Sequence, residues 1–434
     1  MRAGGLSRRL IRNGAILLSG SGGAALLAIV AVAINSRALT LTEFGTFALL
    51  QATALLIAGF FTFATQQPVV KLGVEALDKG DKERFERLVG MGFAADFASA
   101  VGAMALATGI ALAAPILFGA PDDRAAAALV VAASLLFQGY RTSEGIFRAF
   151  DRFDQMGLIQ VSAAAVQLCL SAFLWWADAP FIAYAWLAAV TIALPSLLQL
   201  ASACMLLRRK GMRPRFRAIR EPTDDRREFV AYCWSTWATG SLDTVRMNGD
   251  APLVGFLVSV EAAGIYNVAR QLAGVLRKGT QIYASVFFPE LAAFASRGDT
   301  ERPRRLLRKI LYLTLGLTVA GTAGAALIGE WVLKTAFGPE FEAGHLVLML
   351  LFAAAGIQLL SATYSMYVQA FIGPAALLVA YLLATLSFAI VIVPALLVGG
   401  IAGAGVAQMT FFVVLAVACR FRLRRGAKQV GITQ

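Results

Sequence analysis

Charged residues are scarce in this sequence, and their scarcity excludes an ordinary soluble protein. Of the 434 residues, 15% are Asp, Glu, Lys or Arg and 59% are hydrophobic, and the mean hydropathy is +0.71. One soluble core cannot hide so much apolar surface, so we expect lipid to be the solvent. At roughly 20 residues a span, a dozen spans use about 240 residues. The remainder suffices for connectors and leaves no room for a separate soluble domain.

Cysteine and histidine are rarer still, which limits the disulfides, metal sites and catalytic sites that the chain can form. The four cysteines are scattered and form no C-x-x-C pair, so neither a disulfide framework nor a metal cluster is indicated. The single histidine, His345, cannot build a metal site or a catalytic triad alone. The G-x-x-x-x-G-K-[ST] phosphate-binding loop is also lacking, so no nucleotide is expected. We therefore predict no catalytic residue, no resident metal and no cofactor.

Twelve apolar stretches are long enough to cross a bilayer. The first follows Arg2, Arg8, Arg9 and Arg12 and superficially resembles a signal peptide, but it continues to about Ser36, which favours an uncleaved first helix. The predicted spans lie near residues 14–36, 44–65, 89–114, 125–147, 156–177, 181–207, 229–258, 264–287, 310–333, 344–370, 375–397 and 401–420.

The positions of the basic residues predict the topology. Of the 39 Lys and Arg residues, 31 fall in connectors on one side if the N-terminus is cytoplasmic. Arg124 and Lys334 fall on the opposite side, and the other six lie within spans. Cytoplasmic connectors are enriched in Lys and Arg, so we place both termini on the cytoplasmic side of the membrane. The net charge of +13 then reflects topology and not nucleic-acid binding.

The longest connector divides the chain almost in half. Residues 208–228 are rich in Arg and contain Pro214 and Pro222, which predicts a linker. We expect a six-helix N-terminal lobe at residues 1–207, a cytoplasmic linker at 208–228 and a six-helix C-terminal lobe at 229–434.

Short motifs recur in the two halves in the same order. The first two pairs are 219 residues apart and the third pair 221, and the first pair aligns Gly45 with Gly264. An even number of spans in each half makes the repeat parallel, with its axis along the membrane normal. We predict an all-α membrane protein whose two lobes rock to give alternating access. The matching segments are 43–48 with 262–267, 118–119 with 337–338, and 147–150 with 368–371.

Residues 250–269 carry an Asp, then Leu-Val-Gly, then Gly-x-Tyr-x-x-Ala, and family-like pieces recur at 41–48, 289–299 and 337–343. Together they resemble the polysaccharide transporter branch of the multidrug/oligosaccharidyl-lipid/polysaccharide (MOP) superfamily, which includes the Wzx-type O-antigen flippases. The resemblance implies a MATE-like two-lobed bundle that passes a polyprenyl-diphosphate-linked oligosaccharide, such as an O-antigen or exopolysaccharide unit, to the periplasmic leaflet. The implied partners are this lipid-linked oligosaccharide, the bilayer, a glycan polymerase and glycosyltransferases.

Ionisable residues within spans are the functional candidates, because each costs at least ~2.5–3.5 kcal/mol near the bilayer centre. Asp243, Arg246 and Asp250 are three and four residues apart in the seventh predicted span, which places them on one helix face. Two interpretations remain open. The cluster neutralises itself and packs on a neighbour, or it faces a cavity where Arg246 offers a planar fork to a diphosphate.

The remaining candidates lie on neighbouring spans. Arg270 and Arg277 are seven residues apart, with Lys278 beside the second, although basic side chains near helix ends also snorkel to the interface. On the fourth span, Arg141 is expected to pair with the acid three residues later. The candidate substrate-binding residues are Arg246, Arg270, Arg141, Arg277, Lys278, Asp243 and Asp250.

Ion coupling has three candidate acids. Asp96, on the third span, has no partner nearby in sequence, so it either hydrogen-bonds to a neighbouring helix or binds H⁺ or Na⁺. Asp243 and Asp250 are the other two candidates.

Six basic against four acidic residues within the spans give a small basic excess. This sign suits an anionic phospho-sugar lipid, whereas a cation-coupled multidrug antiporter, the main alternative, favours an acidic cavity and exports cationic dyes. A third alternative is a membrane-embedded glycan polymerase or ligase. Such an enzyme needs a large periplasmic loop with clustered acids or a histidine, and the predicted outside connectors are too short. The leading hypothesis is a flippase and not an enzyme.

Overall fold

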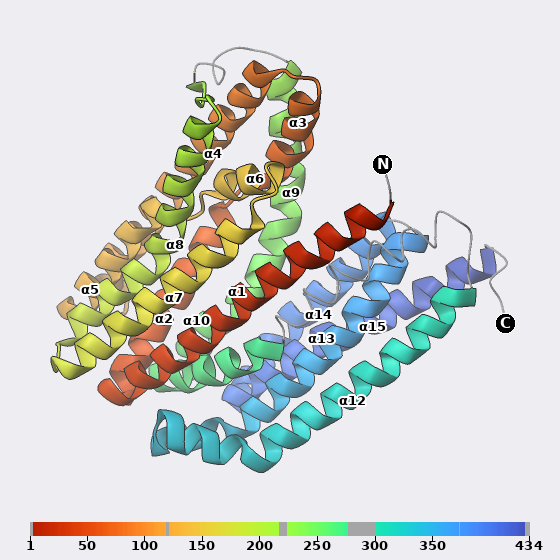
Figure 1. Cartoon of the computed structure of the whole chain (residues 1–434). Helices are drawn as coiled ribbons and strands as arrows, with labels where there is room; N and C mark the ends of the chain where they lie inside the picture. The colour runs from red at the N-terminus through yellow and green to blue at the C-terminus, as the bar shows by residue number, and fades with distance from the viewer. Residues whose placement is uncertain (1–2, 119–120, 217–223, 277–300, 373, 430–434) are drawn as a thin grey trace. The chain divides into compact units, whose positions relative to one another are not determined.

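The computed structural model describes residues 3–118, 121–216, 224–276, 301–372 and 374–429, and these residues form helices and connectors without a strand (Figure 1). A further helix covers residues 260–276. The other elements, in chain order, are α1 (Ala3–Ala38), α2 (Leu41–Phe61), α3 (Gln66–Asp78), α4 (Lys82–Phe118), α5 (Asp122–Ser134), η1 (Leu135–Phe137), α6 (Arg141–Ala149), α7 (Phe153–Trp176), α8 (Phe181–Arg209), α9 (Asp224–Asn248), α10 (Asp250–Leu257), α12 (Glu301–Val332), η3 (Leu333–Phe337), η4 (Pro339–Gly344), α13 (His345–Phe371), α14 (Pro374–Gly399) and α15 (Ile401–Gln429).

Ten helical segments in the described part of the chain are long and apolar enough to cross a membrane. They coincide with ten of the twelve predicted spans, which confirms an all-α, multi-pass membrane protein. The seventh predicted span, 229–258, is divided between α9 and α10. The eighth, 264–287, runs past residue 276 and so lies partly outside the described residues. The total of twelve therefore stays a prediction.

Contacts between residues divide the chain into two compact units. Unit 2 comprises Ala15–Leu39 and Thr46–Gly249, and within it α5 and α8 pack together beside α4 and α7. At one end of α4, α3 packs on α6 and α9 (Figure 1). These helices meet in an apolar core whose fully buried members include Val69, Leu72, Phe85, Leu88, Ile146 and Phe147. This core fixes the cytoplasmic end predicted for these helices.

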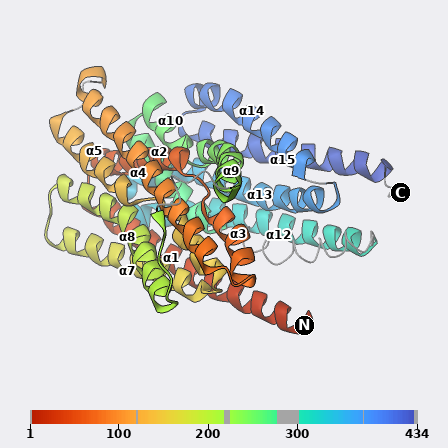
Figure 2. The same cartoon turned by 90° about the horizontal axis from the view of Figure 1, so that it is seen from above.

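Unit 1 comprises Met1–Gly14, Thr40–Gly45 and Asp250–Gln434. Within it α12, α13, α15 and α14 run side by side, and α13 and α14 both pack closely on α15 (Figures 1 and 2). The short helix α10 lies against α14 and α15. Small residues such as Ala380, Ala384 and Ala404 are fully buried in these helices, so their backbones approach closely, as membrane helices do.

The two compact units do not divide at the linker. The unit boundary lies between Gly249 and Asp250, because α9 packs on α3 and α4. The predicted linker begins within α8, which ends at Arg209. Residues 210–215 are not helical and fold back on α4, where the Arg215 amide donates to the Glu86 carbonyl at 3.0 Å. Residues 217–223 of the linker lie outside the described residues. The division into lobes at 1–207 and 229–434 stays a prediction.

The predicted repeat has a matching local structure where α2 and the helix 260–276 begin. Thr40 and Ser259, 219 residues apart, both precede a helix. The Thr40 hydroxyl accepts from the Glu43 amide at 3.3 Å, and the Ser259 hydroxyl accepts from the Ala262 amide at 3.1 Å. Both are N-cap bonds to the third helical residue. The two helices therefore begin at corresponding positions of the repeat.

The close packing of α14 on α15 leaves no room for a side chain at Gly403. A Cβ built on Gly403 would lie 2.0 Å from the Ala395 carbonyl oxygen, whereas Gly316 on α12 has nothing within 4 Å. Gly403→Ala should therefore lower the free energy of unfolding by about 1–3 kcal/mol through overpacking. Gly316→Ala, the control, should be neutral or slightly stabilising. Thermal midpoints in detergent check this, and equal midpoints for the two variants would contradict the packing.

Candidate functional site

The carboxylate of Asp250 lies at the start of α10 and is almost fully buried, with 1% of its surface exposed. One oxygen accepts from the Ala251 amide at 2.8 Å and from the Arg270 guanidinium at 2.9 Å. The other accepts from the Tyr266 hydroxyl, and from the Gln408 amide at 3.1 Å. A carboxylate has about four acceptor positions. Four donors therefore surround a single buried charge.

These donors come from three separate elements and enclose a small pocket. Tyr266 and Arg270 are one helical turn apart on the helix 260–276, and Gln408 belongs to α15. The remaining lining residues are Ala273, Leu351, Ala354, Ala355 and Phe412. Because the Asp250 carboxylate is bonded to Arg270, the arginine is held at this pocket with its charge neutralised. The Asp250 carboxylate therefore positions the Arg270 guanidinium at this pocket.

The predicted helix that contains Asp243, Arg246 and Asp250 is interrupted. α9 ends at Asn248, and Asp250 begins α10 after Gly249. The shared helix face of the three residues stays a prediction. Asp250 is bonded to residues of unit 1. The backbone of Asp243 lies in α9, but its side chain is outside what the structure describes.

Arg246 lies in the last turn of α9 and is buried, with 6% of its surface exposed. The helix C-terminus carries a partial negative charge, which stabilises a cation there. A buried arginine is costly in lipid and marks functional sites in membrane proteins. Arg246 therefore remains a candidate for binding an anionic group.

Arg141 pairs as the sequence predicts. Its guanidinium lies 3.3 Å from Glu144 on α6, and Glu144 also accepts from Arg148, a partner that the sequence prediction missed. Glu144 is mostly buried, whereas Arg141 and Arg148 are about half exposed. The spacing of three and four residues on a helix brings such pairs together.

Two candidates, Arg277 and Lys278, lie outside the described residues, so their predicted role stays a prediction.

Asp96 is a second buried carboxylate, and it joins two helix starts within unit 2. It lies on α4 with 2% of its surface exposed. The Thr65 hydroxyl, just before α3, donates to one oxygen at 2.7 Å. The Thr142 amide, in the first turn of α6, donates to the other at 2.9 Å. Hydrogen bonds to neighbouring helices, one of the two predicted roles, are confirmed.

Both helix starts bonded to Asp96 follow a break in helical structure. The chain leaves helical structure between α2 and α3, and again at Gly139 between η1 and α6, where φ is +90°. Half-helix N-termini within a membrane carry partial positive charge and often face bound ions or substrates. In this structure the group bonded at the start of α6 is the protein's own carboxylate. The sequence alone could not single out Thr65 and Thr142 as partners of Asp96, because serine and threonine are common in packed membrane helices.

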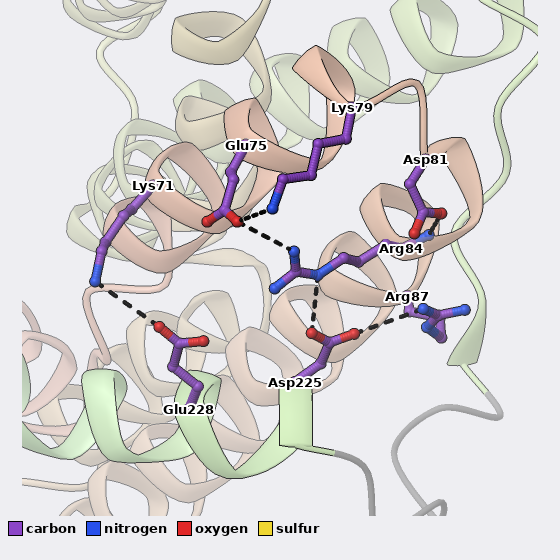
Figure 3. Close-up of polar contacts among 8 residues, drawn as sticks. All are labelled: Lys71, Glu75, Lys79, Asp81, Arg84, Arg87, Asp225 and Glu228. Atoms are coloured by element: carbon purple, nitrogen blue, oxygen red, sulfur yellow. Dashed lines mark hydrogen bonds and ion pairs between the residues drawn. The ribbon is translucent and has the colours of Figure 1, made fainter.

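Figure 3 shows a charged cluster that fastens the start of α9 to α3 and α4. The Asp225 carboxylate lies 2.8 Å from Arg84 and 3.5 Å from Arg87, and Glu228 lies 3.8 Å from Lys71. The cluster falls on the predicted cytoplasmic side. Exposed ion pairs contribute little singly, but a network at one helix start fixes its position more firmly.

Glu75 extends this cluster on α3. Its carboxylate lies 2.6 Å from Lys79 and 3.6 Å from Arg84 (Figure 3). The hydrogen bond from Lys79, together with its charge, holds the pKa of Glu75 below its usual range. Glu75 therefore keeps its negative charge in mildly acidic solution.

The fold defines a class of protein: a multi-pass membrane protein with the architecture of MOP-superfamily transporters. The structure matches an inward-facing multidrug resistance MATE transporter with a TM-score of 0.71 over 94% of this chain and 95% of that one, at 14% identity. It matches the lipid II flippase MurJ in an inward closed conformation with a TM-score of 0.71 over 96% of this chain and 90% of that one, at 12% identity. Such low identities show the fold alone.

The sequence match is more specific. The family model described as "Polysaccharide biosynthesis protein" matches residues 10–295. This chain belongs to that family, which confirms the predicted polysaccharide transporter branch. A relative, inner membrane protein YghQ of Escherichia coli (strain K12), is 27% identical over 343 residues, which are 78% of this chain and 95% of the relative.

The buried pair of Asp250 and Arg270 makes a testable contribution to stability. Removing one member of a buried ion pair strands the other charge and typically costs about 3–5 kcal/mol. Asp250→Asn and Arg270→Gln should each lower the thermal midpoint in detergent clearly, and the double variant should lower it less than the sum of the two. Asp154→Asn, in an exposed pair with Arg152, is the control and should change it little. Strict additivity of the two single effects would contradict the pairing.

Proposed function

We propose that this protein is a flippase that carries a polyprenyl-diphosphate-linked oligosaccharide from the cytoplasmic to the periplasmic leaflet of a bacterial inner membrane. Membership of the polysaccharide biosynthesis family supports a saccharide cargo. The structural neighbours are described as transporters and a lipid II flippase, which supports transport without chemical conversion. The relative YghQ is described as an inner membrane protein, which supports the location.

The observation that carries the proposal is the polarity of α9. This helix has 25 residues, long enough to cross a bilayer, and its sequence from Ser235 to Arg246 mixes apolar residues with hydroxyl and charged residues. Ionisable residues within a membrane bundle face its interior or a water-filled path, so α9 suits the lining of such a path. Its polar residues within the membrane-length stretch are Ser235, Thr236, Thr239, Ser241, Asp243, Thr244 and Arg246.

Arg246 supplies a suitable group for the diphosphate on that helix. A guanidinium binds phosphate oxygens through two parallel N–H bonds, which adds directional selectivity to charge attraction. The lipid tail of the cargo remains in the bilayer while the head group follows the polar path. Arg270, Arg141, Arg277, Lys278, Asp243 and Asp250 remain proposed contributors to head-group binding.

Arg246→Ala should insert and fold but transfer labelled lipid-linked oligosaccharide across reconstituted vesicles at least roughly tenfold more slowly. A charge-assisted hydrogen bond contributes about 1.5–3 kcal/mol, and 1.4 kcal/mol corresponds to a factor of ten. Arg246→Lys keeps the charge but not the planar fork and should lose most of the rate.

Arg209→Ala serves as the control for charge, because Arg209 is exposed at the end of α8. Its transfer rate should equal that of the unmodified protein. Equal rates for Arg246→Ala and Arg209→Ala would contradict the role of Arg246.

A second candidate function, a cation-coupled multidrug antiporter, is favoured by the buried Asp96. A carboxylate with two neighbouring hydroxyls, Thr65 and Thr142, offers oxygen ligands to H⁺ or Na⁺. The same group serves equally as the coupling site of a flippase, with Asp243 and Asp250 as further proposed sites. Export of cationic dyes from vesicles distinguishes the antiporter, because a flippase for an anionic lipid leaves the dyes in place.

Asp96→Asn tests ion coupling. The amide keeps the shape of the side chain but removes the charge that binds a cation. Transfer by the unmodified protein should respond to an imposed pH or Na⁺ gradient, and transfer by Asp96→Asn should not. Asp122→Asn, at the exposed start of α5, is the control. A gradient response that persists in Asp96→Asn would remove Asp96 from the coupling site.

A further inference from the structure

Two corresponding residues of the repeat touch each other in unit 1. Gly45 near the start of α2 corresponds to Gly264 near the start of the helix 260–276, at the offset of 219. A Cβ built on Gly264 would lie 3.0 Å from the Gly45 Cα, and one built on Gly45 would lie 2.2 Å from the Val260 carbonyl oxygen. The two backbones are therefore in direct contact, and only glycine fits at Gly45.

A second corresponding pair lies beside the first. The Thr42 hydroxyl donates to the Glu261 carboxylate at 2.7 Å, and these residues are also 219 apart. Copies of one segment touch through the same residues only where a two-fold axis passes between them. The pseudo-two-fold axis of the repeat therefore passes between the first turns of these two helices.

The chain path shows that this contact joins the two halves of the sequence. Thr40–Gly45 belongs to unit 1, whereas the residues on both sides of it, Ala15–Leu39 and Thr46–Gly249, belong to unit 2. The first turn of α2 is thus held by residues of the C-terminal half. Phe44 supports the contact: it is fully buried and packs edge-to-face on Phe341, with ring centroids 5.5 Å apart.

We propose that the contact of Gly45 and Thr42 with Gly264 and Glu261 is the extracytoplasmic gate of the transporter. The predicted topology puts the starts of both helices on the periplasmic side. The inference rests on the proposed flippase function, because two repeats that give alternating access must part on the side where cargo is released. The backbone contact excludes even a water molecule between the helices. Release of a lipid-linked head group to that side requires this contact to open.

A reversible cross-link tests whether the contact opens. Thr42→Cys and Glu261→Cys are combined in a protein whose four native cysteines have been replaced and whose transfer activity has been verified. A short bifunctional thiol reagent joined through a reducible disulfide links the pair. Transfer of lipid-linked oligosaccharide should fall at least tenfold on linking and recover on reduction. A linked protein that transfers at the unlinked rate would overturn the gate.

Leu382→Cys with Leu386→Cys is the matched control pair. Both residues are exposed on one face of α14 and four positions apart, so a link between them joins no separate elements. Transfer should be unchanged by linking this pair.

An accessibility measurement tests the gate without any cargo. Gly45→Val forces the two helices apart, so a single Thr42→Cys should react several-fold faster with a membrane-impermeant maleimide added outside. Gly22→Val is the control, because a Cβ at Gly22 meets nothing within 4 Å. Labelling that is no faster in Gly45→Val than in Gly22→Val would overturn the gate. If the unlinked protein transfers no oligosaccharide, the proposed cargo fails, and the labelling rate still decides the gate.

Discussion

The structure depends on one constraint: a charge inside lipid must find its partners within the protein, because no water is available to solvate it. The Asp250 carboxylate meets this constraint with four donors from α10, the helix 260–276 and α15. Asp96 meets it with donors at the starts of α3 and α6. Each carboxylate thereby fastens together the elements that supply its donors.

Interrupted helices link this constraint to transport. Helical structure is interrupted between α2 and α3, at Gly139 and at Gly249. Irregular backbone at membrane depth is tolerated only within protein or beside a water-filled path. The polar helix α9 ends at the third break, with Arg246 in its last turn. The proposed transport of an anionic head group assigns the polar path to α9 and its Arg246.

Hydropathy predicted ten of the spans closely, because membrane insertion depends on segment composition. The cytoplasmic placement of both termini, which rests on the basic residues, stays a prediction. The same signals could not locate the break at Gly249, since one glycine in an apolar stretch is usually tolerated. The prediction of one unbroken helix over 229–258 was therefore wrong. The partners of Asp250 follow from tertiary packing: Tyr266 stood within a recognised motif, but Gln408 is a lone amide in an apolar span. The repeat offset, by contrast, correctly aligned the helix starts at Thr40 and Ser259.

The most direct test of the account is transfer by the unmodified protein. Purified protein is reconstituted in vesicles with a fluorescent polyprenyl-diphosphate oligosaccharide, and an added glycosidase or quencher reports the leaflet that holds the head group. The account predicts rapid transfer between leaflets that protein-free vesicles lack, with no transport of a cationic dye. Transfer at the protein-free rate, together with dye export, would contradict it.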